Sequence, residues 1–86
     1  MEIRDPVERY ISEVLTTHGI RFTHEMEKPS QRFDFHLHDF DLFIEVKQFS
    51  TDRTARQIAG MTNLILIQGM PAAIAFGVML AGIAVK

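Results

Sequence analysis

Apolar residues recur at helical spacing close to the start of the chain and predict an amphipathic helix. The apolar stripe consists of Val7, Tyr10, Ile11, Val14 and Leu15. Before it, Asp5 suits the N-cap, Pro6 the first helical position, and Glu8 the completion of a capping box. The pattern stops near His18 and Gly19, where a glycine commonly ends a helix. The sequence therefore predicts a capped helix that packs one side on a core.

Strict alternation of apolar and polar residues in the middle of the chain predicts a β-hairpin. The two faces of the first strand carry Phe33, Phe35 and Leu37 on one side and Asp34, His36 and His38 on the other. The two faces of the second strand carry Leu42, Ile44 and Val46 toward the core and Phe43, Glu45 and Lys47 outward. Asp39 and Phe40 mark the turn between them, and a shorter strand over residues 20–25 precedes the hairpin.

The rest of the chain predicts a helix, a buried strand and a final helix. Residues 50–52 supply capping side chains for a helix over 53–61 that ends near Gly60. The unbroken apolar run at 64–67 is typical of a strand covered on both faces, and an apolar helix follows over 70–85. A helix between the third and fourth strands makes their connection a parallel crossover. We therefore expect an α/β fold of order α-β-β-β-α-β-α, with a four-stranded mixed sheet flanked by helices.

Composition limits the classes of protein to which the chain can belong. Its 86 residues suit one compact domain, so we expect a single domain over residues 1–86. The absence of cysteine excludes disulfides and cysteine–zinc sites, and it fits a reducing compartment such as the cytoplasm. The net charge of -2 is unusual for a nucleic-acid binder, because such proteins are mostly basic. Acidic residues that bind cations would make an occupied site less negative than this balance suggests.

The uncharged run over residues 70–85 raises the question of a membrane. As a helix it would span about 24 Å at 1.5 Å per residue, less than a hydrocarbon core of about 30 Å. We therefore expect no membrane segment, but a buried helix or one that joins two copies in a homodimer. A membrane-associated or partner-binding protein organised around this run is the alternative.

The hairpin brings two acids and a lysine together. If its turn is symmetric about Asp39 and Phe40, Asp34 lies opposite Glu45, with Cβ atoms about 4.5–5.5 Å apart. Two carboxylates at that distance repel, and a divalent cation between them would offset the repulsion. Lys47 lies on the same face, two residues beyond Glu45. A surface salt bridge between Lys47 and one of the acids is the alternative interpretation.

This arrangement suits hydrolysis of a phosphodiester. Carboxylates that hold Mg²⁺ or Mn²⁺ place the ion where it lowers the pKa of a bound water and neutralises charge on the phosphate. Lys47 would orient or deprotonate the attacking water, or stabilise the phosphorane oxygens. An alternative metal site, for zinc, uses Asp34, His36 and His38, which share one strand face.

The same residues resemble a nuclease superfamily. Asp34, ten intervening residues, and then Glu45-Val46-Lys47 at the end of an apolar strand are similar to the PD-(D/E)xK motif, with Phe33 in place of its proline. The expected order α-β-β-β-α-β is that of the restriction-endonuclease-like core and covers nearly the whole chain. The segment 43–47 looks most like the small stand-alone virus-type replication-repair nucleases and the archaeal Holliday-junction resolvases.

The resemblance implies a role for each motif residue. Asp34 and Glu45 would be metal ligands, the Val46 carbonyl a third ligand, and Lys47 the catalytic lysine. Glu8 would be an additional ligand, since the resolvases place a glutamate on the first helix, although its capping role already explains it.

Residues around the motif are candidates for contacts with DNA or metal. The resemblance implies that Gln57 faces the active site from the second helix, and a solvent-facing glutamine is the alternative. Arg53 and Arg56 would contact phosphates near the positive end of that helix, unless they belong to a solvated helix face. His36 is a further candidate for a phosphate contact, and Glu25 could reach the metal.

Taken together, the patterns and the resemblance predict a Mg²⁺- or Mn²⁺-dependent deoxyribonuclease that acts as a homodimer, with branched and single-stranded DNA as candidate substrates. The alternative is a catalytically inactive nucleic-acid-binding or assembly subunit on the same fold.

Overall fold

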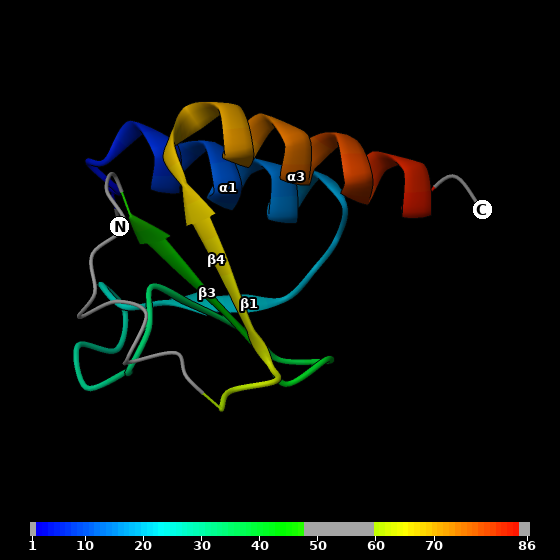
Figure 1. Cartoon of the computed structure of the whole chain (residues 1–86). Coiled ribbons are helices and arrows are strands. Elements are labelled where there is room, and N and C mark those ends of the chain that lie inside the picture. The colour runs from blue at the N-terminus through cyan, green and yellow to red at the C-terminus, as the bar shows by residue number, and fades with distance from the viewer. Residues whose placement is uncertain (1, 48–59, 85–86) are drawn as a thin grey trace.

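The computed structural model describes residues 2–47 and 60–84, and these form an α/β domain (Figure 1). The elements are α1 (Pro6–Thr17), β1 (Phe22–His24), β2 (Phe35–Leu37), β3 (Leu42–Lys47), β4 (Leu64–Gln68) and α3 (Gly69–Ala84). The four strands lie in the order β1-β2-β3-β4, with antiparallel pairs β1–β2 and β2–β3 and a parallel pair β3–β4. The predicted mixed sheet with a parallel crossover is confirmed.

The predicted boundaries of the first strand and of the second helix are wrong. The first strand is shorter than residues 20–25, because regular strand geometry covers only Phe22–His24, although backbone hydrogen bonds from His38 to Arg21 and from Glu25 to Asp34 continue on either side. The helix predicted over 53–61 falls mostly outside the described residues, but Gly60 and Met61 are not helical, so its expected end is too late. Gly60 has a φ of 85°, a backbone conformation that favours glycine and interrupts a helix.

Helix α1 begins and ends where the sequence predicts. The Asp5 side chain accepts hydrogen bonds from the backbone N–H groups of Val7, at 2.9 Å, and Glu8, at 3.0 Å. The helix stops at His18, and Gly19 follows with a φ of 68°. The capping box, however, is incomplete, because the Glu8 carboxylate bonds to His24 on the sheet instead of returning to Asp5.

The hairpin has the predicted register. Leu37 pairs with Leu42 and Phe35 with Ile44, and continuing this register places Asp34 opposite Glu45. Phe33 departs from the prediction, since β2 begins only at Phe35. Its ring packs on Phe43, with centroids 5.4 Å apart, and so lies on the opposite side of the sheet from the core.

Both described helices cover one face of the sheet. Figure 1 shows α1 and α3 side by side above the strands. The core between the two layers consists of Val7, Ile11, Leu15, Phe35, Leu37, Ile44, Ile67 and Ala73. The apolar stripe of α1 therefore meets the apolar face of the hairpin, and this layer supports the strand ends that carry the candidate chemistry.

Helix α3 is apolar on its outer side as well as its inner side. Val78 is 68% exposed and Met79 is 66% exposed, and the helix carries no charged residue. Beside it, an apolar groove of about 710 Å³ runs between α3 and the strands, with Phe40, Leu42 and Ile65 among its lining residues. No helix within the described residues is long and apolar enough to cross a membrane.

The helices approach closely at Gly77. A Cβ atom there would lie 3.1 Å from the Tyr10 hydroxyl and 3.3 Å from a Val14 methyl group. We expect Gly77→Val to push α3 away from α1 and to lower the free energy of unfolding by about 1–3 kcal/mol. Gly82→Val, in the same helix with nothing within 4 Å of its Cβ, is the matched control. Urea denaturation measures both, and equal stability of the two variants would contradict the close contact.

Candidate active site

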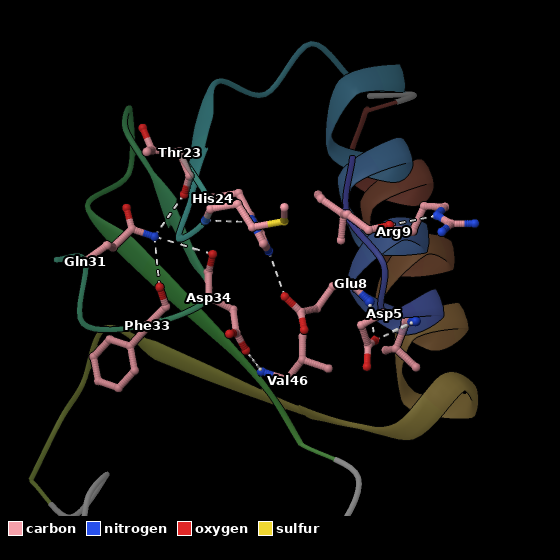
Figure 2. Close-up of polar contacts among 12 residues, drawn as sticks. Asp5, Glu8, Arg9, Thr23, His24, Gln31, Phe33, Asp34 and Val46 are labelled. Carbon is pink, nitrogen blue, oxygen red and sulfur yellow. Dashed lines mark hydrogen bonds and ion pairs between the residues drawn. The ribbon is translucent and has the colours of Figure 1, made fainter. Parts of the chain in front are cut away.

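Ionisable side chains gather where the first turn of α1 lies over one edge of the sheet. This carboxylate cluster consists of Glu8 from α1, His24 and Glu25 at the end of β1, Asp34 just before β2, and Glu45 and Lys47 on β3. Antiparallel pairing explains the convergence, because the end of β1, the start of β2 and the end of β3 lie next to one another at the same end of the sheet. In Figure 2, the side chains of Glu8, His24 and Asp34 point toward one another between α1 and the sheet.

Asp34 fills the place where β2 and β3 separate. The register makes residue 33 the partner of Val46, but the Val46 N–H donates to Asp34 Oδ2 instead, at 2.7 Å (Figure 2). The N–H and C=O of one strand residue point to the same neighbouring strand. The Val46 carbonyl therefore also points to the side of β3 on which Asp34 lies.

The acids of the cluster are crowded together out of water. Asp34 is only 7% exposed, and its carboxyl lies within hydrogen-bonding reach of the carboxyls of Glu45 and Glu25. Burial, followed by the contact with Glu45, raises the pKa of Asp34 to about 6, although the Val46 N–H favours the charged form. Burial is also the main reason that the pKa of Glu25 is raised, and Asp34 adds to the effect.

Glu8 joins the cluster from the helix. Its Oε1 lies 2.7 Å from Nε2 of His24, which is 1% exposed and packs edge-on against the Phe35 ring. Burial raises the pKa of Glu8, the hydrogen bond from His24 opposes the increase, and the charge of Asp34 adds to it. Three carboxyl groups of the cluster thus hold protons more tightly than free carboxyls do.

These residues suit a hard divalent cation. Carboxylate and carbonyl oxygens are the ligands that Mg²⁺ and Mn²⁺ prefer. A bound cation would reduce the repulsion between the carboxylates, as protonation does in its absence. One set of possible ligand atoms, on Glu8, His24 and Glu25, lies within 4.8 Å of one another. Asp34 and Glu45 extend this set toward β3, where the Lys47 ammonium lies 3.9 Å from Glu45 Oε2.

The structure brings together most of the residues that the sequence singles out. Asp34, Glu45 and Lys47 are neighbours, and Glu8 lies beside them. Val46 contacts Asp34 through its N–H, so its role as a carbonyl ligand stays a prediction. Arg53, Arg56 and Gln57, the predicted DNA contacts of the second helix, lie outside the described residues.

The histidines of β2 and the following turn take other partners. His36 stacks on Phe43, with ring centroids 4.6 Å apart, and its Nε2 lies 3.2 Å from Asp41. His38 contacts the Thr23 hydroxyl. Among the described residues, the ligand atoms that gather within 4.8 Å of one another belong to Glu8, His24 and Glu25, and not to Asp34, His36 and His38, so the zinc site predicted from the strand alone is wrong. A phosphate contact by His36 stays a prediction.

His24 is the member of the cluster that the sequence analysis did not identify. Alternation along β1 places it on the same face as Phe22, and its strand partner is the buried Phe35. A histidine on the apolar face of a strand needs a polar partner. That position was the signal in the sequence, but the identity of the partner depends on how α1 crosses the sheet.

Comparisons with family models, with curated proteins and with solved structures return no match to this chain. Its function is therefore inferred from its own residues and their geometry.

The raised pKa of Asp34 predicts how stability depends on pH in metal-free buffer. The folded state binds this proton more tightly than the unfolded state, whose Asp pKa is about 3.9, so stability falls as the pH rises from about 4 to about 6. Glu8 and Glu25 act in the same direction. We expect Asp34→Asn to reduce this slope and to stabilise the protein at pH 7.5 by about 1–3 kcal/mol.

Asp39→Asn is the matched control for this measurement. The Arg21 guanidinium beside Asp39 lowers the pKa of that carboxyl, so it titrates below the window and its removal leaves the slope unchanged. Urea denaturation at several pH values in the presence of a chelator gives the slopes. A wild-type protein that becomes more stable between pH 4 and pH 6 would contradict the prediction.

Proposed function

We propose that this protein is a Mg²⁺- or Mn²⁺-dependent nuclease that hydrolyses phosphodiester bonds of DNA. The observation that carries the proposal is the contact between the Asp34 and Glu45 carboxyls, with the Lys47 ammonium 3.9 Å from Glu45. Two acids and a lysine in contact at one edge of a sheet form a compact set of ligands and proton carriers. A plain surface salt bridge explains Lys47 and Glu45 but gives no reason to bury Asp34 beside a second acid.

The chain's own residues would hold the ion. Asp34, Glu45 and Glu8 would supply carboxylate oxygens, and the Val46 carbonyl points to the same side of β3 as Asp34. A bound divalent ion lowers the pKa of a coordinated water and neutralises charge on the phosphate. Lys47 is the member of the cluster best placed to meet the substrate, because about a third of its side chain remains exposed.

Lys47 would serve the reaction as a positioned cation. Its ammonium can orient the attacking water or donate to the phosphate oxygens, where negative charge grows as the phosphorane forms. Glu45 Oε2 lies 3.9 Å from this ammonium, so the ion pair would keep the lysine near an ion that Glu45 holds. The order of the described elements, a helix followed by three antiparallel strands and a fourth strand parallel to the third, is compatible with the restriction-endonuclease-like core and supports the same assignment by analogy.

We expect cleavage of at least one of single-stranded, duplex or branched DNA in the presence of Mg²⁺ or Mn²⁺, and none with a chelator. Lys47→Ala and Asp34→Asn should lower the cleavage rate by about 10²–10⁴-fold, because each removes a group that acts on the reacting atoms. Lys28→Ala removes an exposed lysine in a loop outside the cluster and is the matched control for lost charge.

Initial rates on fluorescently labelled DNA, with circular dichroism to verify folding, decide the matter. Cleavage by folded Lys47→Ala at the wild-type rate would contradict the site assignment. DNA binding without cleavage by the wild type would favour the alternative, an inactive binding or assembly subunit.

We also propose that two copies associate through α3. The outer side chains of this helix are apolar, and the adjacent groove is lined by apolar residues. In a dimer, the apolar surface of α3 on each copy would be buried against the same surface of the other copy. The partner would bring a second active site to the same particle. A helix without charged residues offers no complement to a charged partner.

We expect Val78→Glu to convert a dimer into a monomer, because a carboxylate on the apolar surface would be buried without a partner. Thr16→Glu places the same group on an exposed position of α1 and should leave the dimer intact. Size-exclusion chromatography with light scattering gives the mass of each variant. A wild-type protein that is monomeric at all concentrations tested would rule out the association.

A further inference from the structure

We propose that His24 is a positioning residue that holds the Glu8 carboxylate in the metal site and does not bind the metal itself. This inference rests on the proposed metal-dependent function. It concerns a residue that the nuclease motif does not contain, and it follows from the hydrogen bonds of one buried ring.

The partners of His24 determine which of its nitrogens carries the proton. The Met26 backbone N–H donates to Nδ1 at 3.1 Å. A backbone N–H can only donate, so Nδ1 is the accepting nitrogen and the proton of the ring is on Nε2. Nε2 lies 2.7 Å from Glu8 Oε1, and its N–H therefore donates to that oxygen.

The ring cannot easily leave this arrangement. His24 is 1% exposed, and its ring packs against Phe35, which is fully buried, with centroids 4.9 Å apart. Rotating the ring by 180° would exchange nitrogens for carbons and lose both hydrogen bonds. The packing and the Met26 amide together fix the direction in which the N–H donor points.

Fixing one oxygen of Glu8 directs the other. The bond from His24 involves Oε1, which leaves Oε2 for a ligand. In Figure 2 the side chains of Glu8 and Asp34 point toward one another between α1 and the sheet, so a cation held by Oε2 of Glu8 would lie on the side of Asp34. Such outer donors orient ligating carboxylates, and their removal typically weakens metal binding by about 10–100-fold.

Proximity alone suggests a different role for His24. A ligand atom of His24 lies within 4.8 Å of ligand atoms on Glu8 and Glu25, as in a three-residue metal site. A histidine that binds a metal through Nε2, however, carries its proton on Nδ1 and donates it to an acceptor. Here Nδ1 faces the N–H of Met26, which is a donor, so the surroundings of the ring disfavour the tautomer that a ligand requires.

Two substitutions separate the nitrogens of the ring. In His24→Gln, the amide NH₂ can take the place of Nε2–H and donate to Glu8. In His24→Asn, the shorter side chain can accept from the Met26 N–H but does not reach Glu8. We expect His24→Asn to raise the dissociation constant for Mn²⁺ at least 10-fold, and His24→Gln to stay within about 3-fold of the wild type.

The measurement is titration with Mn²⁺ alone, followed by the electron paramagnetic resonance signal of the free ion. The same pair is measured in a Glu8→Gln background, in which the ligand that His24 positions is already lost. There, His24→Asn should cause no further loss, because its effect passes through Glu8. Urea denaturation of each variant verifies that it is folded under the conditions of the titration.

The outcomes separate this inference from the proposed function. If the wild type does not bind Mn²⁺, the proposed function fails and the role of His24 fails with it. If the wild type binds and His24→Asn binds equally well, the role of His24 alone is wrong. Equal losses in both His24 variants that persist in the Glu8→Gln background would identify His24 as a direct ligand and overturn the proposal.

Discussion

The hydrogen bond from the Val46 N–H to Asp34 holds the two central strands at the point where they separate. A regular hairpin would satisfy this N–H with the carbonyl of residue 33. Using a side-chain carboxylate instead keeps β2 and β3 together while it draws an acid into the edge of the sheet. The same bond partly offsets the cost of burying Asp34 beside two other acids. The geometry of the carboxylate cluster depends on this hydrogen bond, in which the Asp34 carboxylate takes the place of a backbone carbonyl.

The cluster combines two environments that seldom meet. On one side lies the packed layer of Ile11, Phe35 and Ile44, each fully buried. On the other lies the solvent-reaching end of Lys47. Acids placed at such a boundary lose much of their hydration, which is why burial comes first among the causes that raise their pKa values. A polyvalent cation compensates for lost hydration better than the remaining surface water can. The crowded carboxylates therefore favour binding of a cation.

Short-range patterns of the sequence contained the hairpin and its register. A strand has a side-chain period of two, and Asp39 and Phe40 limit the turn, so the pairing of Leu37 with Leu42 and the approach of Asp34 to Glu45 follow by counting. The contact between Glu8 and His24 could not be obtained in this way. It depends on where the first turn of α1 crosses the end of β1, and packing of the whole core fixes that position.

Phe33 is a residue whose position the alternation pattern predicted incorrectly. Alternation assigned it to the core, but the chain leaves the strand geometry before Phe35, and its ring moves to the other side of the sheet. Departures of this kind concentrate where backbone hydrogen bonds are replaced by side chains, as they are at Asp34. The residues near the candidate site are therefore the ones that a regular pattern describes least well.

The direct junction between β4 and α3 connects the sheet to the helix layer without a loop. Lys47 pairs in register with Gln68, and the next residue, Gly69, already begins the helix with a φ of 78°. No residue lies between β4 and α3, so the packing of the first turn of the helix and the pairing of the last strand residue must be satisfied together. The strand position that pairs with the lysine therefore lies directly beside the first residue of the apolar helix.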